Sequence, residues 1–298
     1  MNPFVTILVA FRAVLRNKMR SFLTTLGIII GVAAVIAMMA IGAGARSQVE
    51  QAFAAMGTNL LIVMPGSTTA GGSFGGFGSM PTITWDDFTA IKNEVPTVKA
   101  AAPQLRANQS IVSDEMNWTT GVVGTSPEYF DIRAWPMAAG NTWTQADVDA
   151  GSKVVVLGQT VVERLYGRTA NPVGQTVRIG KTPFAVVGVA AKKGQSPSGQ
   201  DYDDAAFIPF TTFAQRIQGG LGKYLSGSIY VQATSAQTTN RALEDTKALL
   251  RDRHHIPPGG DDDFSIRNLS EVASAQQQGT ETMTTLRSEE RRVGKECL

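Results

Sequence analysis

The sequence predicts an α+β protein in which one N-terminal transmembrane helix precedes a folded region of two subdomains. Two observations lead to this prediction. Residues 21–45 contain no charged side chain, and a run of this length is sufficient to cross a bilayer. Beyond it, short runs rich in Val, Ile and Phe alternate with helical patterns and with Gly or Pro. About 240 residues remain for the folded region, enough for two modest subdomains.

The first twenty residues predict a helix that lies in the cytoplasmic interface of the membrane, over residues 1–20. Apolar residues recur there at helical spacing, and arginines occupy the other faces. The apolar positions are Phe4, Ile7, Leu8, Phe11 and Leu15. Membrane lipid is therefore the first partner that we expect.

Residues 21–45 are predicted to form the transmembrane helix. At about 1.5 Å per residue the run extends roughly 37 Å, more than the ~30 Å hydrocarbon core requires. Four basic residues precede the run with no acidic residue among them, whereas Arg46 and Glu50 follow it. Those basic residues are Arg12, Arg16, Lys18 and Arg20. This asymmetry predicts a cytoplasmic N-terminus, with everything after residue 45 on the outer side of the membrane.

A cleaved signal peptide is the alternative for the same segment. The small residues over 42–45 resemble a cleavage site, and cleavage near Ala45 would release a secreted enzyme. The apolar run is, however, longer than the 7 to 15 residues of a typical signal peptide, and its basic leader has a helical pattern of its own. The membrane helix is therefore the favoured interpretation.

Gly27 and Gly31 are the candidate site residues, for helix packing. They form a GxxxG pair inside the span, and the absence of side chains would let another helix approach closely. Glycine is also common in transmembrane helices without such a role. Both interpretations stay open.

After the span, the pattern of Val49, Phe53 and Met56 predicts that the helix continues as an amphipathic stalk. Residues 59–64 then predict a buried strand, and a glycine-rich and serine-rich loop extends to Met80. Thr84 and Asp87 form a capping-box pattern that predicts a helix to Glu94. Short strands are expected near residues 98, 111, 118 and 122–123.

The middle of the chain predicts a β-rich subdomain over residues 121–204. It contains strands at 153–157, 175–179 and 184–189 and a short helix at 159–166. Strands at 204–208, 228–233 and 264–266 then alternate with helices at 211–217 and 236–253. We therefore expect residues 46–120 and 205–268 to form one split α+β subdomain. A helix is predicted over 269–286, whereas residues 287–298 change abruptly to a charge-rich tail that is expected to be foreign to the protein.

Composition excludes several classes of function. The formal net charge is +2 and the basic residues are scattered beyond residue 20, so no nucleic-acid partner is expected. The single cysteine, Cys297, rules out a disulfide framework or a CxxC redox pair. No GxxxxGK[ST] motif occurs in the sequence, so we expect no cofactor in this chain and no P-loop ATPase of its own.

Four local patterns invite a chemical interpretation, and each has a more ordinary one. His254 and His255 are adjacent and therefore form a poor metal chelate, so a solvated helix end is expected. Asp201, Asp203 and Asp204 begin like a calcium loop that then lacks its glycine and its final acid.

Ser196 misses the GxSxG pattern by one position. Trp118, Trp135 and Trp143 could line a ligand groove, but buried core anchors are commoner. The sequence therefore predicts no catalytic, cofactor-binding or metal-binding residue, and we expect that the chain is not an enzyme.

Longer segments of the sequence are more specific. They are Gly124–Ile132 (GTSPEYFDI), Trp135–Gly140 (WPMAAG), Val155–Gln159 (VVLGQ), Asn171–Ile179 (NPVGQTVRI), Phe184–Val189 (FAVVGV), Phe207–Pro209 (FIP) and the membrane segment Leu26–Ile41. Together they closely resemble the MacB-type ABC transporter permease family, and the resemblance covers residues 1 to about 286.

The resemblance implies a permease subunit of an efflux transporter, with a porter-like subdomain (residues 46–120 and 205–268) and the β-rich one on the periplasmic side. It implies that ATP is bound by a separate ABC ATPase subunit, and that the permease forms a homodimer or pairs with a paralogous permease. A periplasmic adaptor and an outer-membrane channel are further expected partners, and the cargo would be a drug, a peptide or a lipoprotein-type substrate. Three more transmembrane helices would follow residue 286 in such a permease. The alternative function is a single-pass, membrane-anchored binding or sensor protein.

Overall fold

The computed structural model describes residues 18–54, 59–66, 81–114, 116–196, 199–219, 222–269 and 271. Most of the predicted interfacial helix, the glycine-rich loop, all but two residues of the predicted helix over 269–286 and the whole charge-rich tail lie outside these residues. The chain divides into two compact units, Met1–Gln51 and Ala52–Leu298. The second unit is called the core domain below, and each unit is described by itself.

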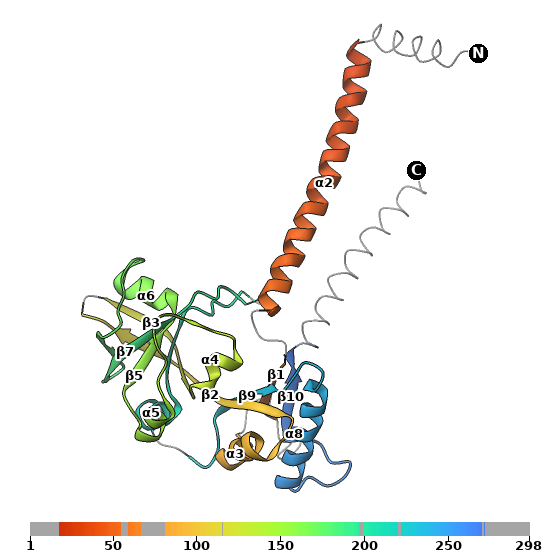
Figure 1. Ribbon diagram of the computed structural model, residues 1–298. Helices are drawn as coiled ribbons and strands as arrows, with labels where there is room; N and C mark the ends of the chain where they lie inside the picture. The colour runs from red at the N-terminus through yellow and green to blue at the C-terminus, as the bar shows by residue number, and fades with distance from the viewer. Residues whose placement is uncertain are drawn as a thin grey trace, which may run out of the picture. The chain divides into compact units, whose positions relative to one another are not determined.

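The described part of the first unit is helix α2 up to Gln51. The helix itself extends over Lys18–Ala54, 37 residues, and is drawn in orange-red in Figure 1. Its segment Ser21–Gly42 is long and apolar enough to cross a membrane. The large apolar side chains of Ile28, Val35 and Met39 along it are each more than half exposed. A helix that is apolar on every side suits a lipid environment. The predicted continuation beyond the span is confirmed as far as Ala54.

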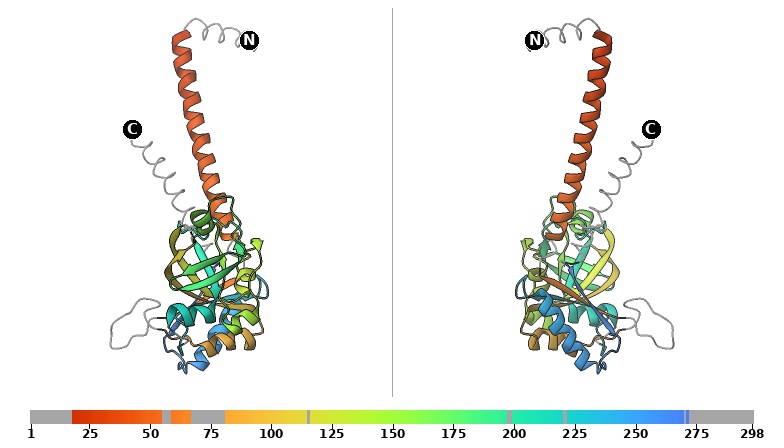
Figure 2. Two further views of the ribbon diagram at one scale, coloured as in Figure 1. Left: turned by 90° about the vertical axis from the view of Figure 1, so that its left-hand side faces the viewer. Right: turned by 90° about the vertical axis from the view of Figure 1, so that its right-hand side faces the viewer.

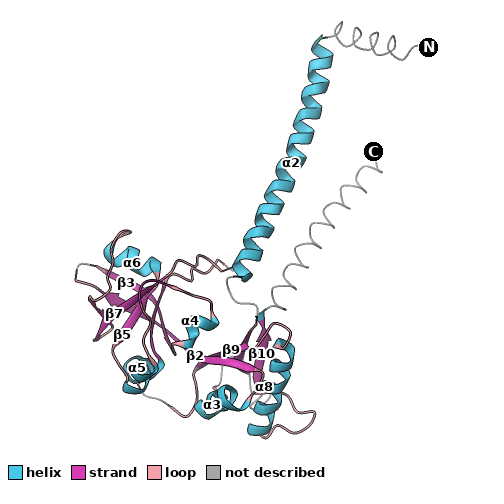
Figure 3. Ribbon diagram, viewed as in Figure 1, coloured by secondary structure: helices cyan, strands magenta, loops and turns pink. Residues whose placement is uncertain are grey.

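The core domain alternates strands with short helices, as Figure 3 shows. In chain order the elements are β1 (Leu60–Pro65), α3 (Trp85–Glu94), β2 (Val98–Val112), β3 (Asn117–Thr125), α4 (Glu128–Ile132), β4 (Met137–Gly140), α5 (Gln145–Ala150), β5 (Val154–Leu157), α6 (Gln159–Tyr166), β6 (Thr176–Ile179), β7 (Thr182–Ala190), β8 (Ala205–Pro209), α7 (Phe210–Phe213), the π-helical turn η1 (Ala214–Gln218), β9 (Gly227–Ala233), α8 (Thr239–Arg253) and β10 (Phe264–Asn268).

The strands of the core domain form a mixed sheet with the order β10-β1-β9-β2-β3-β8-β5-β7-β4, and β6 pairs with β2 and β7. β3 pairs with β8 in parallel, as β5 does with β7, and the other pairs are antiparallel. The 15-residue strand β2 connects the two halves of the sheet. Its residues Val98–Leu105 pair with β9, and its residues Leu105–Val112 pair with β3.

Apolar side chains fill both faces of this sheet. Adjacent residues of a strand point to opposite faces, and Leu60 and Leu61 of β1 accordingly belong to different buried clusters. On one face α3 and α8 pack against each other and against the sheet, near the foot of both views in Figure 2. On the other face α4 contacts β2 and β9 and contributes the buried side chains of Tyr129, Phe130 and Ile132. The predicted α+β class is confirmed.

Most predicted elements are present at nearly the predicted positions. Helix α6 has the predicted bounds, and α3 begins with the predicted capping box between Thr84 and Asp87. The short strands expected between 98 and 123 are instead two long strands of one hairpin, β2 and β3. Three elements were not predicted, α4, β4 and α5, none of which exceeds six residues. The predicted subdomain boundary at residue 120 falls within β3, and the division into subdomains stays a prediction.

Candidate functional site

The predicted packing residues Gly27 and Gly31 lie one turn apart on α2, so they face the same side of the helix. A Cβ atom added at either position would meet nothing within 4 Å among the described residues. The glycines therefore leave a shallow strip on a helix that also carries exposed Ile, Val and Met side chains. Such a strip can accept the backbone of another helix at close range, and which helix occupies it stays a prediction.

His254 directly follows helix α8 and connects distant parts of the core domain. Its Nε2 lies 3.1 Å from Asp87 Oδ2 of α3, and its Nδ1 lies 2.7 Å from Asp263 Oδ1. Arg253 Nε donates to Asp87 Oδ1 at 2.7 Å. The side chain of His254 is only 9% exposed. The expected solvated helix end is therefore wrong for His254, because its two acidic partners come from other parts of the chain.

This cluster shifts the pKa values of both His254 and Asp87. Hydrogen bonding to Asp87 raises the pKa of His254 to about 9, against the opposing effect of burial, and Asp263 adds to the rise. Burial alone would raise the pKa of Asp87. Hydrogen bonds from His254, Thr84 and Arg253 outweigh this effect and hold the pKa well below the usual range. The cluster is thus a set of charged groups that neutralise one another between α3, α8 and the segment before β10.

The three aspartates of the incomplete calcium pattern bind separate groups. Asp201 accepts hydrogen bonds from Thr160 Oγ1 and from the backbone N–H of residue 203. Asp203 accepts from the backbone N–H groups of residues 193 and 194, and Asp204 from the side chains of Trp118 and Thr120. They hold the loop before β8 in place. Among the described residues, no three His, Cys, Asp or Glu side chains are grouped so as to hold a metal ion.

The tryptophans are mainly core residues, as the ordinary interpretation expected. Trp135 and Trp143 are 4% and 3% exposed, and Phe207 and Phe130 pack edge-on against them, respectively. Trp118 is partly buried, and the guanidinium of Arg164 lies 4.7 Å from its ring centre. Trp135 also lines two hollows of the core domain.

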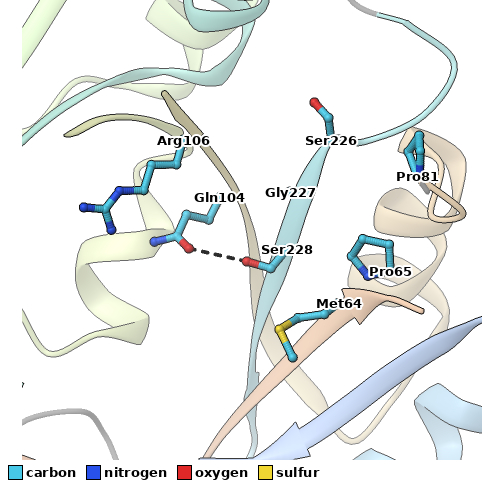
Figure 4. A pocket seen from close by; sticks show the side chains of 8 residues that line it. All are labelled: Met64, Pro65, Pro81, Gln104, Arg106, Ser226, Gly227 and Ser228. Carbon is cyan, nitrogen blue, oxygen red and sulfur yellow. Dashed lines mark hydrogen bonds between the residues drawn. The ribbon is translucent and has the colours of Figure 1, made fainter. Parts of the chain in front are cut away.

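A hollow of about 430 Å³ lies where β1, β2 and β9 meet, and Figure 4 shows the side chains around it. Gln104 and Arg106 project from the same side of β2, and Ser228 Oγ donates to Gln104 Oε1 at 3.4 Å. Met64 and Pro65 of β1 give the hollow an apolar wall. It combines an apolar surface with one cation, a combination typical of ligand pockets.

A smaller cavity of about 100 Å³ shares Gln104 and Arg106 with this hollow. Its inner wall includes Arg133, the residue directly after α4, which is only 4% exposed. No pattern in the sequence indicated this cavity. Its lining comes from six separate segments. The arginines at positions 106 and 133 belong to no motif in the sequence, and they come together only in the folded sheet.

Comparisons with known proteins agree with the fold and extend to the membrane helix. The family described as MacB-like periplasmic core domain matches residues 21–249. The chain is 36% identical to the macrolide export ATP-binding/permease protein MacB of Syntrophobacter fumaroxidans over 93% of its own length and 46% of the relative's. For MacB of Chlorobium luteolum the identity is 37%, over 93% of this chain and 41% of the relative. The chain thus spans less than half the length of these curated relatives.

Two solved structures share the fold of the core domain. The periplasmic region of MacB from Actinobacillus actinomycetemcomitans matches with a TM-score of 0.60 and 22% identity, over 75% of this chain and 94% of the other. The extracellular domain of the ABC-type transporter YknZ from Gram-positive bacteria matches with a TM-score of 0.54 and 20% identity, over 70% of this chain and 100% of the other. Together with the match over residues 21–249, these findings establish that the chain belongs to the MacB-like family of ABC transporter permeases.

Proposed function

We propose that the chain is the membrane-anchored, periplasmic part of a MacB-like efflux permease, in which ATP hydrolysis by a partner ABC ATPase changes the conformation of the core domain. The observation that carries this proposal is that the family match covers the apolar helix and the core domain together. A helix that is continuous from Lys18 to Ala54 is a stiff element, so a displacement at its membrane end can reach its other end.

In this proposal the N-terminus is cytoplasmic, because the basic residues precede the apolar segment. Gly27 and Gly31 form the contact with another transmembrane helix, in a homodimer or with a paralogous permease. An adaptor and an outer-membrane channel would work with the core domain, and lipid surrounds α2. The cargo is a drug, a peptide or a lipoprotein-type substrate. The chain itself contributes no catalytic residue and no cofactor.

The first experiment is to read the genomic locus beyond codon 286 and to test the product in cells. We expect three further apolar spans and a neighbouring gene with a P-loop ATPase. Expression of the complete permease with that ATPase should then lower the susceptibility of an efflux-deficient strain to a macrolide or a peptide antibiotic. The same permease with an ATPase whose P-loop lysine is replaced serves as the control. A genuine stop after Leu298 would contradict coupling by this chain and favour the single-pass binding protein.

A further inference from the structure

The cavity beside Arg133 contains a buried positive charge without a fixed negative partner. The Arg133 side chain takes part in no ion pair within the described part of the chain, and its Nε has no hydrogen-bond partner there. Its guanidinium carbon lies 5.2 Å from the ring centre of Tyr202 and 5.7 Å from that of Tyr230. Burying a cation is costly unless an anion compensates it. Aromatic faces compensate a guanidinium only in part.

The tyrosines around Arg133 do not supply the missing charge. Burial raises the pKa of Tyr129 and the pKa of Tyr230, so both phenols are neutral at physiological pH. Tyr129 Oη also accepts a hydrogen bond from Gln104 Nε2 at 3.1 Å. These groups can therefore act as hydrogen-bonding walls of the cavity, but not as its anion.

Asp201, which lines the cavity, and Asp203, two residues further along the chain, already accept hydrogen bonds from other groups. Asp201 is part of the lining, but its two oxygens accept from Thr160 Oγ1 at 2.8 Å and from a backbone N–H at 2.9 Å. Asp203 accepts two backbone N–H groups, at 2.7 and 2.9 Å. Neither forms an ion pair with Arg106 or Arg133 among the described residues.

Two further cations lie close by: Arg106 lines the cavity, and Lys193 contacts two of its lining residues, Arg133 and Trp135. Lys193 Nζ donates to the backbone oxygen of Arg133 and lies 5.1 Å from the ring centre of Trp135. Burial lowers the pKa of Lys193 to about 8, and the charge of Arg133 contributes to this. Arg106 reaches the cavity from β2. A Cβ at Gly121 of β3 would lie 2.8 Å from its Nη2, so the glycine leaves room for the guanidinium.

The outer edge of the cavity is accessible, because Arg106 and Gln200 are both exposed. In the amide orientation that satisfies both side chains, Gln200 accepts from Arg106 Nη1 and Nη2 at 2.9 and 3.0 Å. This interaction holds Arg106 at the entrance. A volume of about 100 Å³ corresponds to roughly three water molecules in the liquid. The cavity can therefore hold a carboxylate group with a short stem, and not a large ligand.

We propose that this cavity binds a carboxylate, which lies between Arg133 at the inner end and Arg106 at the entrance. A planar carboxylate can accept two parallel hydrogen bonds from one guanidinium. The Nε of Arg133, which has no partner among the described residues, can donate one of them. The body of the ligand would extend past Gln104 and Arg106 into the larger, partly apolar hollow of Figure 4. The carboxylate belongs either to a small organic acid or to the C-terminus of a peptide. This site is independent of the coupling function proposed above.

The test uses the full chain in detergent micelles, labelled with ¹⁵N-arginine, at pH 7 and constant ionic strength. The Nε–H signal of Arg133 is identified by its loss in Arg133→Gln and is followed while acetate replaces chloride. We expect a saturable shift of this signal and a rise in the thermal unfolding midpoint, since a ligand that binds the native state stabilises it. Absence of a saturable shift would overturn the proposal.

Variants separate binding from a purely structural role. Arg106→Gln removes the exposed cation and should weaken acetate binding by about 10-fold or more, the usual effect of one lost charge-assisted hydrogen bond. Arg164→Gln is the matched control, because Arg164 is also exposed and lies over a tryptophan ring but does not line the cavity. Equal affinity in Arg106→Gln and in the control would contradict the proposal. Because Arg106 is exposed, this comparison holds even if Arg133→Gln fails to fold.

Three further ligands identify the source of the carboxylate. A tripeptide with a free C-terminus should shift the Arg133 signal, and the same tripeptide with a C-terminal amide should not. A shift with acetate but not with the free tripeptide would restrict the site to small acids. A larger effect of inorganic phosphate than of acetate would overturn the assignment to carboxylates.

Discussion

At the residue scale, close packing at Gly124 gives a direct test of the core. Gly124 lies on β3 beside Phe213 of α7, and a Cβ added there would lie 2.5 Å from Phe213 Cβ and 2.6 Å from its Cγ. The ring cannot move away easily, because Phe213 is only 2% exposed. Glycine at this position therefore allows α7 to approach the sheet.

We predict that Gly124→Ala lowers the free energy of unfolding by about 1–3 kcal/mol, the usual cost of overpacking a core. Urea unfolding followed by near-ultraviolet circular dichroism measures the change. Gly222→Ala is the control, since a Cβ there meets nothing within 4 Å. Equal stability of the two variants would show that β3 and α7 are not packed as described.

Sequence patterns predicted single residues well only where the partners are local. The capping box at Thr84 and Asp87 depends on residues three positions apart, and it was predicted correctly. The environment of His254 was not, because Asp87 lies 167 positions away in the sequence. The cavity at Arg133 was missed for the same reason. Long-range electrostatic partners are a property of the folded sheet and leave no periodic signal in the sequence.

At the scale of elements, the strands and helices with strong periodicity were found, and the short ones were not. β5, β7 and α6 have clear apolar patterns, and their positions match the predictions within two residues. Helix α5 was missed although Thr144 and Asp147 form the same capping box as at α3. Its six residues contain only one buried side chain, that of Val148, which is too few for a helical period to be visible.

The junction of α3 and α8 predicts a specific dependence of stability on pH. His254 has a pKa of about 9 in the folded protein, above the value of about 6.5 for an unfolded histidine. Its stabilising contribution is therefore complete below pH 6.5 and is lost as the pH rises to 9. The pKa of Asp87 is lowered, so its contribution is present at neutral pH and is lost only in strong acid.

We expect the free energy of unfolding to fall between pH 6.5 and 9, by up to about 3 kcal/mol. His254→Asn should remove this part of the pH dependence and lower the stability at pH 6. His255→Asn, at the adjacent histidine, is the control and should keep the slope of the parent protein. The measurement is urea unfolding at intervals of pH between 6 and 9. A slope unchanged in His254→Asn would contradict the assignment.

At the scale of the whole molecule, the family explains why an apolar helix and a mixed sheet occur in one chain. The sequence resemblance and the fold lead to the same conclusion, although the solved relatives share only 20–22% of their residues with this chain. The fold alone does not specify a cargo, since one fold serves several functions.

The packing strip on α2 predicts an effect on assembly in the membrane. Gly27→Leu and Gly31→Leu fill the strip and should weaken association with a neighbouring transmembrane helix, whereas Ala33→Leu lies about 200° around the helix from Gly31 and should not. Association can be measured with a reporter assay for transmembrane helices in a bacterial membrane. Equal signals from the three variants would show that the strip is not a contact surface.

Measuring the orientation of the chain across the membrane tests the proposed permease function most directly. Cys297 is replaced by serine, and single cysteines are introduced by Lys18→Cys, before the apolar segment, and by Met116→Cys, at an exposed position of the core domain. Cells with a permeabilised outer membrane are treated with a maleimide that cannot cross the inner membrane. We predict labelling at position 116 in intact cells and labelling at position 18 only after lysis. Labelling at 18 but not at 116 in intact cells would contradict a periplasmic core domain and, with it, the proposed permease function.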